Sequence, residues 1–149
     1  MPRAILLVDH GSRRPEVNAT LECVGRLVAW AAGGEVIVRT AHLELAPPTV
    51  AEGLAACVAA GATEVVVHPY LLGAGRHALV DLPRRVDEAG AEFPGLALRV
   101  TAPLGVHPDL AAIVLERCGV PVVRRAMLPG FVCPADAGAC AAPWCGPRE

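Results

Sequence analysis

Apolar residues occur in two kinds of stretch that alternate from the N-terminus to about residue 119. Short runs of branched apolar residues, such as AILLV near the N-terminus and EVVVH in mid-chain, are typical of buried β-strands. Longer stretches place an apolar residue at every third or fourth position, which is the spacing of one helix face. The expected strands span residues 4–8, 35–42, 64–68 and 96–101. The expected helices span residues 15–32, 47–60, 77–91 and 108–118.

Proline and glycine agree with these boundaries. Pro15 suits the first turn of the first helix, where its missing N–H has no partner to lose. Gly61 and Gly119 follow the second and fourth helices, where glycine commonly ends a helix. Pro83 must lie near the start of the third helix or kink it.

Strands that alternate with helices predict a parallel sheet, because each parallel connection needs a crossover segment. Right-handed crossovers place helices on both faces of that sheet. We therefore expect an α/β fold with a doubly wound, flavodoxin-like, four-stranded parallel sheet. Residues 1–119 are expected to form this domain. Residues 120–149, rich in Pro, Gly and Ala without a clear period, are expected to form a Cys-containing tail.

All five histidines fall where a predicted strand ends or in the loop that follows it: His10, His42, His68, His77 and His107. Open parallel sheets bind ligands beyond the carboxyl ends of their strands. Imidazole accepts protons near neutral pH and is a common metal ligand. The pattern indicates metal or proton chemistry at this edge of the sheet.

Four ordered stretches carry a resemblance to a known family: HGSRRPE (10–16), LELAPPTVAEGL (43–54), HPYLLGAGRHALVDLP (68–83) and APLGVHPDLAAIVLERC (102–118). They resemble the small class II tetrapyrrole chelatases of the sirohydrochlorin type, which insert cobalt, nickel or ferrous iron into sirohydrochlorin or a close relative. The resemblance covers about residues 4–118.

The resemblance implies roles for individual residues. His10 would accept a proton and bind the metal, and His77 would be the second metal-binding group. Glu44 would contact the substrate and assist proton removal or substrate placement. The glycine loop would lie along the macrocycle, through Leu71, Leu72, Gly73, Ala74, Gly75 and Arg76. Family members of this length look like half of a two-lobed chelatase, which implies a homodimer.

Three departures from the family pattern leave the metal open among Co²⁺, Fe²⁺ and Ni²⁺. Pro47 stands where the family often has an acidic residue. The chain lacks the His-rich insertion that some members carry before the fourth strand, and the Cys-containing tail is not part of the family core.

The residue types suit this chemistry. Metal insertion removes two N–H protons from the macrocycle and delivers a divalent cation. A neutral imidazole, with an ordinary pKa of about 6.5, serves both purposes. Two strong protein ligands would hold the metal loosely enough to transfer it.

Other residues suit contact with the substrate. Glycines 73 and 75 allow the backbone to approach a flat ring. The substrate carries many carboxylates, which the guanidinium groups of Arg13, Arg14 and Arg76 would pair with bidentately. Ser12 and Tyr70 are further expected substrate contacts.

Composition and motifs argue against other functional classes of protein. The net charge is -2, so no basic field exists to hold nucleic acid or an anionic membrane. No lysine, Walker-type phosphate loop or GxGxxG motif is present, so no nucleotide is expected. No signal peptide and no apolar run of about 20 residues is found, so a cytoplasmic location is expected. Three cysteines lie in apolar helical patterns and are expected in the core: Cys23, Cys57 and Cys118.

Several alternatives remain open. His42 and His68 are interpreted as buried, hydrogen-bonded histidines, His107 as a residue that shapes a turn, and Arg84 and Arg85 as a solvated helix face. Ser12 would either cap the first helix or bind a substrate carboxylate.

The tail thiols and the function as a whole also leave alternatives. Cys133, Cys140 and Cys145 are interpreted as free thiols, with a metal-loading or iron–sulfur site completed across a dimer as the alternative. A non-catalytic tetrapyrrole or metal carrier is the second functional hypothesis. A hydrolase that uses a His pair is the third, although no acidic metal cluster or phosphate loop supports it.

Overall fold

A computed structural model describes residues 3–122 of the chain, which form a four-stranded parallel sheet. The strands are β1 (Arg3–Asp9), β2 (Ile37–His42), β3 (Glu64–Pro69) and β4 (Ala97–Val100). They lie side by side in the order β2-β1-β3-β4, and each neighbouring pair is parallel. All four expected strands are present, with ends shifted by one or two residues. The carboxyl ends of all four strands therefore meet at one edge.

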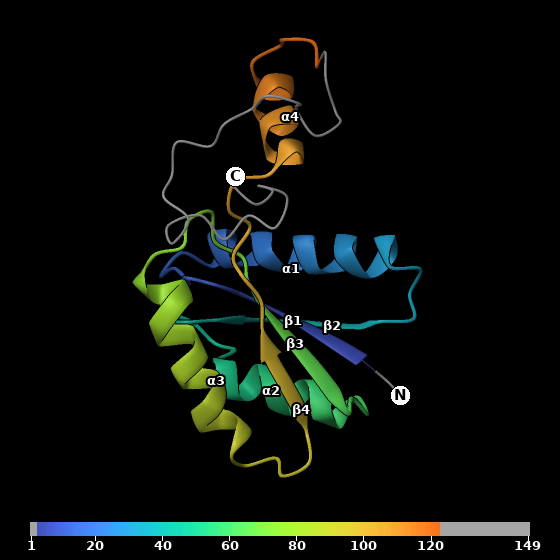
Figure 1. Ribbon diagram of the computed structural model, residues 1–149, viewed down its shortest axis with the longest axis vertical. Helices are drawn as coiled ribbons and strands as arrows, with labels where there is room; N and C mark the ends of the chain where they lie inside the picture. The colour runs from blue at the N-terminus through green and yellow to red at the C-terminus, as the bar shows by residue number, and fades with distance from the viewer. Residues whose placement is uncertain (1–2, 123–149) are drawn as a thin grey trace, which may run out of the picture.

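Helices cover both faces of this sheet, so the predicted α/β, doubly wound class is confirmed (Figure 1). Helix α1 (Pro15–Ala31) lies on one face, while α2 (Val50–Ala59) and α3 (Leu82–Gly90) lie on the other. A π-helical turn, η1 (His77–Asp81), leads directly into α3. The last helix, α4 (Pro108–Arg117), stands beyond α1, apart from the sheet.

The hydrophobic core lies between the sheet and the α2–α3 layer. Leu6, Leu54, Val65 and Leu82 are each 0% exposed and belong to one buried cluster. Cys57 of α2 joins this cluster, as expected, and burial raises the pKa of its thiol to about 11. The expectation for Cys23 and Cys118 is wrong, because both are exposed on helices that bury little surface.

The α1 face of the sheet is less covered than the apolar pattern predicts. Only Leu21 and Gly25 of α1 are buried, whereas Leu27 is 61% exposed. The reason is that α1 packs mainly against β2 and only lightly against β1. Helix α4 buries none of its residues. Apolar surface on both helices is therefore left exposed.

The second and third helices begin later than predicted. Helix α2 begins at Val50 instead of Pro47, because Thr49 and Glu52 form a reciprocal capping box that fixes its first turn. Pro83 lies in the first turn of α3, as expected. The segment before it, predicted as ordinary helix, is the wider η1 turn, in which Leu82 N–H donates to the His77 carbonyl.

The proposed division at residue 119 stays a prediction, because residues 123–149 lie outside the described part. Within residues 3–122, no helix is both long and apolar enough to cross a membrane.

Candidate active site

His10 and His77 come together at the carboxyl edge of the sheet. His10 follows β1, and His77 begins η1 after β3. Their ring centroids lie 4.3 Å apart, with the ring planes at 69°. The chain passes from β1 to β2 on one side and then returns to β3 on the other. Doubly wound sheets bind ligands at such a reversal of strand order. The two residues predicted to handle a metal are thus neighbours at the expected position.

Two carboxylates lie beside the Nδ1 atom of His77. Oδ2 of Asp81 is 3.0 Å away and Oε1 of Glu44 is 4.0 Å away. The Asp81 contact is within ion-pair distance but outside hydrogen-bond geometry, so this buried Nδ1 atom has no hydrogen-bond partner among residues 3–122. A carboxylate beside one imidazole nitrogen orients the ring and favours metal binding through the other nitrogen. The predicted residue Glu44 therefore belongs to the same cluster as the histidine pair.

Asp81 was missed by sequence reasoning. It follows His77 by four residues across η1, and this spacing places two side chains on one face of a helix. That spacing is the sequence signal from which Asp81 could have been found. Across the described range 3–122, no group of three or more His, Cys, Asp or Glu side chains is arranged to hold a metal ion.

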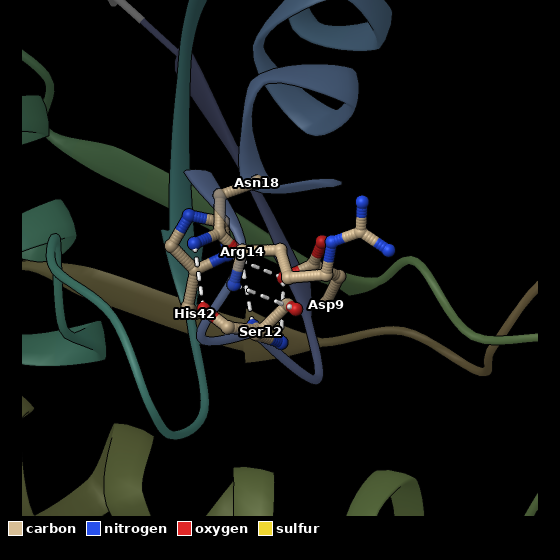
Figure 2. Close-up of polar contacts among 6 residues, drawn as sticks. Asp9, Ser12, Arg14, Asn18 and His42 are labelled. Carbon is tan, nitrogen blue, oxygen red and sulfur yellow. Dashed lines mark hydrogen bonds and ion pairs between the residues drawn. The ribbon is translucent and has the colours of Figure 1, made fainter. Parts of the chain in front are cut away.

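The loop that carries His10 is held by hydrogen bonds to its own backbone (Figure 2). Oδ1 of Asp9 accepts from Gly11 N–H at 3.0 Å. Asn18 accepts from Ser12 N–H at 2.9 Å and donates to the Ser12 carbonyl at 2.8 Å. The Ser12 hydroxyl accepts from Arg14 N–H at 3.1 Å, and Arg14 is the N-cap residue of α1. The helix-cap interpretation of Ser12 is therefore wrong, and the serine stabilises the loop instead.

The other three histidines are hydrogen-bonded within the fold. His42 is 3% exposed, and its Nδ1 lies 2.5 Å from Oδ1 of Asp9. Nδ1 of His68 lies 2.7 Å from Oγ1 of Thr101. His107 is the N-cap residue of α4 and accepts from the N–H of Asp109 at 3.1 Å. These contacts confirm the structural interpretations of His42 and His107, whereas His68 is hydrogen-bonded as predicted but only partly buried.

Two hollows open at this edge, one lined in part by His10 and the other in part by Glu44. The first, of about 290 Å³, lies between the ends of β1 and β3 and α1, and His10, Tyr70 and Leu71 contribute to its lining. The second, of about 610 Å³, lies between the loop after β2 and α3, and is lined in part by Glu44 and Arg85. Of the predicted substrate contacts, Tyr70 and Leu71 therefore line one hollow and Glu44 lines the other.

The glycine loop leaves open space on its surface. Leu72, Gly73, Gly75 and Arg76 are exposed, and Leu71 and Ala74 are partly buried. Among the described residues, no atom would lie within 4 Å of a Cβ atom at either glycine, and neither glycine has a positive φ. The fold itself thus does not require glycine at these two positions. A ligand that approaches the backbone closely gives a reason for it.

Arginine side chains near this edge differ in their partners. Arg13 is exposed, whereas Arg14 pairs with Glu16 at 2.6 Å. Arg76 lies 3.9 Å from Asp81, at the outer limit of an ion pair. Arg13 and Arg76 are therefore better placed than Arg14 to meet an anionic ligand.

The solvated-face interpretation holds for Arg84 and is wrong for Arg85. Arg84 is exposed and lies 4.0 Å from Glu88, one turn further along α3. Arg85 is partly buried in the wall of the larger hollow, and its Nε atom is buried without a hydrogen-bond partner among the described residues. Its position depends on how α3 packs beside the β2 loop, which the helical pattern does not reveal. The predicted tail thiols Cys133, Cys140 and Cys145 lie outside the described residues.

Comparison with known proteins gives a consistent result. The family model CbiX matches residues 4–119. The chain is 42% identical over 113 residues to the Arabidopsis thaliana protein named "Sirohydrochlorin ferrochelatase, chloroplastic", covering 76% of this chain and 50% of that protein. It is 31% identical over 120 residues to the "Sirohydrochlorin cobaltochelatase" of Saccharolobus solfataricus, covering 76% of this chain and 91% of that protein.

A solved structure agrees with the sequence comparisons. The sirohydrochlorin chelatase SirB from Bacillus subtilis subspecies spizizenii in complex with cobalt superposes with a TM-score of 0.70 at 30% identity. The match covers 80% of this chain and 50% of that one. The chain thus spans about half the length of the Arabidopsis and Bacillus proteins.

The burial of His68 predicts a pH dependence of stability. Burial lowers the pKa of His68 from its ordinary value of 6.5. The Thr101 hydroxyl donates to the Ala102 carbonyl, so it accepts from a neutral His68 that carries its proton on Nδ1. Below about pH 6.5 the unfolded chain binds a proton at His68 before the folded chain does. The contribution of His68 to the free energy of unfolding is therefore largest above that pH, and it decreases as the pH drops.

Denaturant unfolding between pH 5 and pH 8 measures this effect. His68→Asn keeps a donor near the Nδ1 position but cannot titrate, so its unfolding free energy should fall less than that of the wild type on acidification. Equal losses in the two proteins would show that His68 does not contribute.

Proposed function

This chain belongs to the CbiX family, and from that premise we propose that it is a sirohydrochlorin chelatase that inserts a divalent metal without consuming a nucleotide. The observation that carries the proposal is the contact between the His10 and His77 rings, 4.3 Å apart at the switch point of the sheet. The relatives named above are sirohydrochlorin chelatases, and two of them are longer proteins of which this chain spans half. The cytoplasmic location expected from the sequence stays a prediction.

His10 and His77 would have different roles at the metal. His10 is exposed at the end of β1, and its side chain forms no hydrogen bond within residues 3–122, so its ring nitrogens are open to a metal or a proton. His77 has carboxylates at Nδ1, which leaves Nε2 as its ligand atom. His10 would bind the metal and accept a pyrrole N–H proton, while Glu44 assists proton removal or positions the ring.

Exposed apolar side chains around the histidines suit the flat face of a macrocycle. Leu45 follows β2, Leu72 follows β3, Leu79 and Val80 lie on η1, and Val106 follows β4, and each is about half exposed or more. We call these five residues the apolar rim. A tetrapyrrole placed against them would cover apolar surface that is otherwise in water. The open space above Gly73 and Gly75 favours the same placement.

The metal is a substrate of this reaction, and the comparisons include both iron and cobalt. One relative is named a ferrochelatase, another a cobaltochelatase, and the SirB structure is a cobalt complex. We propose Co²⁺ or Fe²⁺ as the delivered ion, with Ni²⁺ as a further candidate. Imidazole ligands accept all three, so geometry and supply would decide among them. The iron–sulfur interpretation of the tail stays a prediction.

A non-catalytic carrier on the same scaffold is the alternative function. A carrier would bind the macrocycle without changing its absorption spectrum when metal is added. The proton-accepting position of His10 favours turnover over carriage, since binding alone needs no base.

Replacing His10 tests the proposed function. His10→Ala removes the base and one metal ligand from an exposed site, so we expect the insertion rate to fall by at least about 100-fold while the fold is kept. Anaerobic absorption spectroscopy with sirohydrochlorin and Co²⁺, Ni²⁺ or Fe²⁺ measures the rate, and circular dichroism checks the fold. His107→Ala is the matched control, because it removes a helix-cap histidine from the same edge. Unchanged turnover in His10→Ala would contradict the assignment.

Arg85 offers a test of how the acidic substrate is held. Its buried Nε, which has no hydrogen-bond partner among the described residues, lies in the wall of a hollow that Glu44 also lines, and there it suits a peripheral carboxylate of the macrocycle. We expect Arg85→Gln to raise KM for sirohydrochlorin about tenfold, equivalent to about 1.4 kcal/mol, with kcat little changed. Arg84→Gln removes the neighbouring exposed arginine and should leave KM near the wild-type value. Equal KM values for the two variants would argue against a substrate contact at Arg85.

We also propose that two copies of the chain associate. The chain spans 50% of the SirB chain but 91% of the Saccharolobus protein, so a second copy would supply the missing half. Exposed apolar residues on α1 and α4, including Trp30 at 79% and Val114 at 60%, are surface that association would cover. Sedimentation equilibrium should give twice the chain mass of 15.4 kDa. A single-chain mass at all concentrations would contradict the dimer.

A further inference from the structure

The last residues of β1 and β2 join through their side chains. Asp9 and His42 are register partners in the parallel β1–β2 ladder. His42 is 3% exposed, and Asp9 is about one-fifth exposed. Their Oδ1 and Nδ1 atoms are 2.5 Å apart. Figure 2 shows Asp9 and His42 together with the polar contacts of the loop after β1. The pair thus lies at the end of the strand that leads into the proposed base.

A single carboxylate oxygen connects this pair to the His10 backbone. Oδ1 of Asp9 meets the His42 ring and also accepts from the N–H of Gly11 at 3.0 Å. His10 lies between Asp9 and Gly11, so the carboxylate closes a short turn around it. The buried His42 ring fixes the direction of that carboxylate and, through it, the turn.

Backbone hydrogen bonds also hold the loop that carries Glu44 against the loop that carries His10. Leu43 N–H donates to the Asp9 carbonyl at 2.9 Å, and Glu44 N–H donates to the His10 carbonyl at 3.1 Å. Gly11 has a φ of 86°, and a Cβ there would lie 1.9 Å from the Glu44 carbonyl oxygen. The two loops are therefore in close backbone contact, and a shift in one displaces the other.

We propose that Asp9 and His42 are positioning residues that hold His10 in register with His77 and Glu44. The His10 side chain forms no hydrogen bond of its own within the described residues. Its ring position therefore follows from its backbone, and the backbone turn follows from the Asp9–His42 contact. The inference rests on the proposed function for its catalytic consequence but not for its structural one.

Two substitutions at one position separate positioning from simple stability. His42→Phe keeps a ring that fills the buried space but cannot donate to Asp9. His42→Asn keeps an amide nitrogen close to the Nδ1 position and should restore the contact. Val65→Ala is the matched control, because it truncates a buried β3 residue away from the carboxyl edge. It should lower the melting temperature without moving the loops.

The first measurement does not depend on activity. Nuclear Overhauser contacts between the His10 and His77 ring protons, assigned with His10→Ala, should be present in the wild type and Val65→Ala. They should be lost in His42→Phe and recovered in His42→Asn. Ring contacts that persist in His42→Phe would overturn the inference, whatever reaction the protein catalyses.

The second measurement uses metal insertion. We expect kcat to fall about tenfold or more in His42→Phe, with KM for sirohydrochlorin changed less than twofold, and to recover in His42→Asn. A His42→Phe protein that matches Val65→Ala in kcat would also overturn the inference. Absence of insertion in the wild type would instead count against the proposed function, and the ring contacts would still decide the role of the pair.

Discussion

Parallel pairing of β1 with β2 on one side and β3 on the other brings three strand ends together, and every feature of the candidate site depends on it. β1 lies at the reversal of strand order, the position at which doubly wound sheets bind ligands. His10, Glu44 and His77 leave the sheet from these three strands. Backbone hydrogen bonds from Leu43 and Glu44 to the β1 end continue the ladder past the strands.

Around this edge, polar side chains carry out two separate tasks. Asp9, Asn18 and His42 bond within the fold and fix the backbone of the loops. His10 and His77 remain exposed enough to meet a ligand, with carboxylates on one side of His77 only. Buried polar groups must be paired, whereas groups that exchange protons or metals must be open on one side. Burial thus separates His42, which is bonded within the fold, from His10 and His77, which would act on the ligand.

The two faces of the sheet differ in a way that bears on assembly. The α2–α3 face contains a closed core, in which Leu54 and Val65 have no exposed surface. On the other face, α1 covers only part of the sheet, and α4 stands apart with apolar residues exposed. The proposed dimer would cover this exposed apolar surface.

The order of strands and helices, their approximate bounds and the gathering of histidines at one edge are all determined by the sequence. These depend on local periodicity, on proline and glycine, and on the rule that parallel strands point the same way. The four motifs predicted roles for His10, His77 and Glu44.

Sequence could not determine which histidines touch, because distances across the edge depend on strand order and on the paths of the loops. Tertiary packing alone placed His42 beside Asp9, Glu44 beside His77, and Arg85 in the wall of a hollow. It also left α1 and α4 exposed, because a helical pattern records an apolar face but not the surface that covers it.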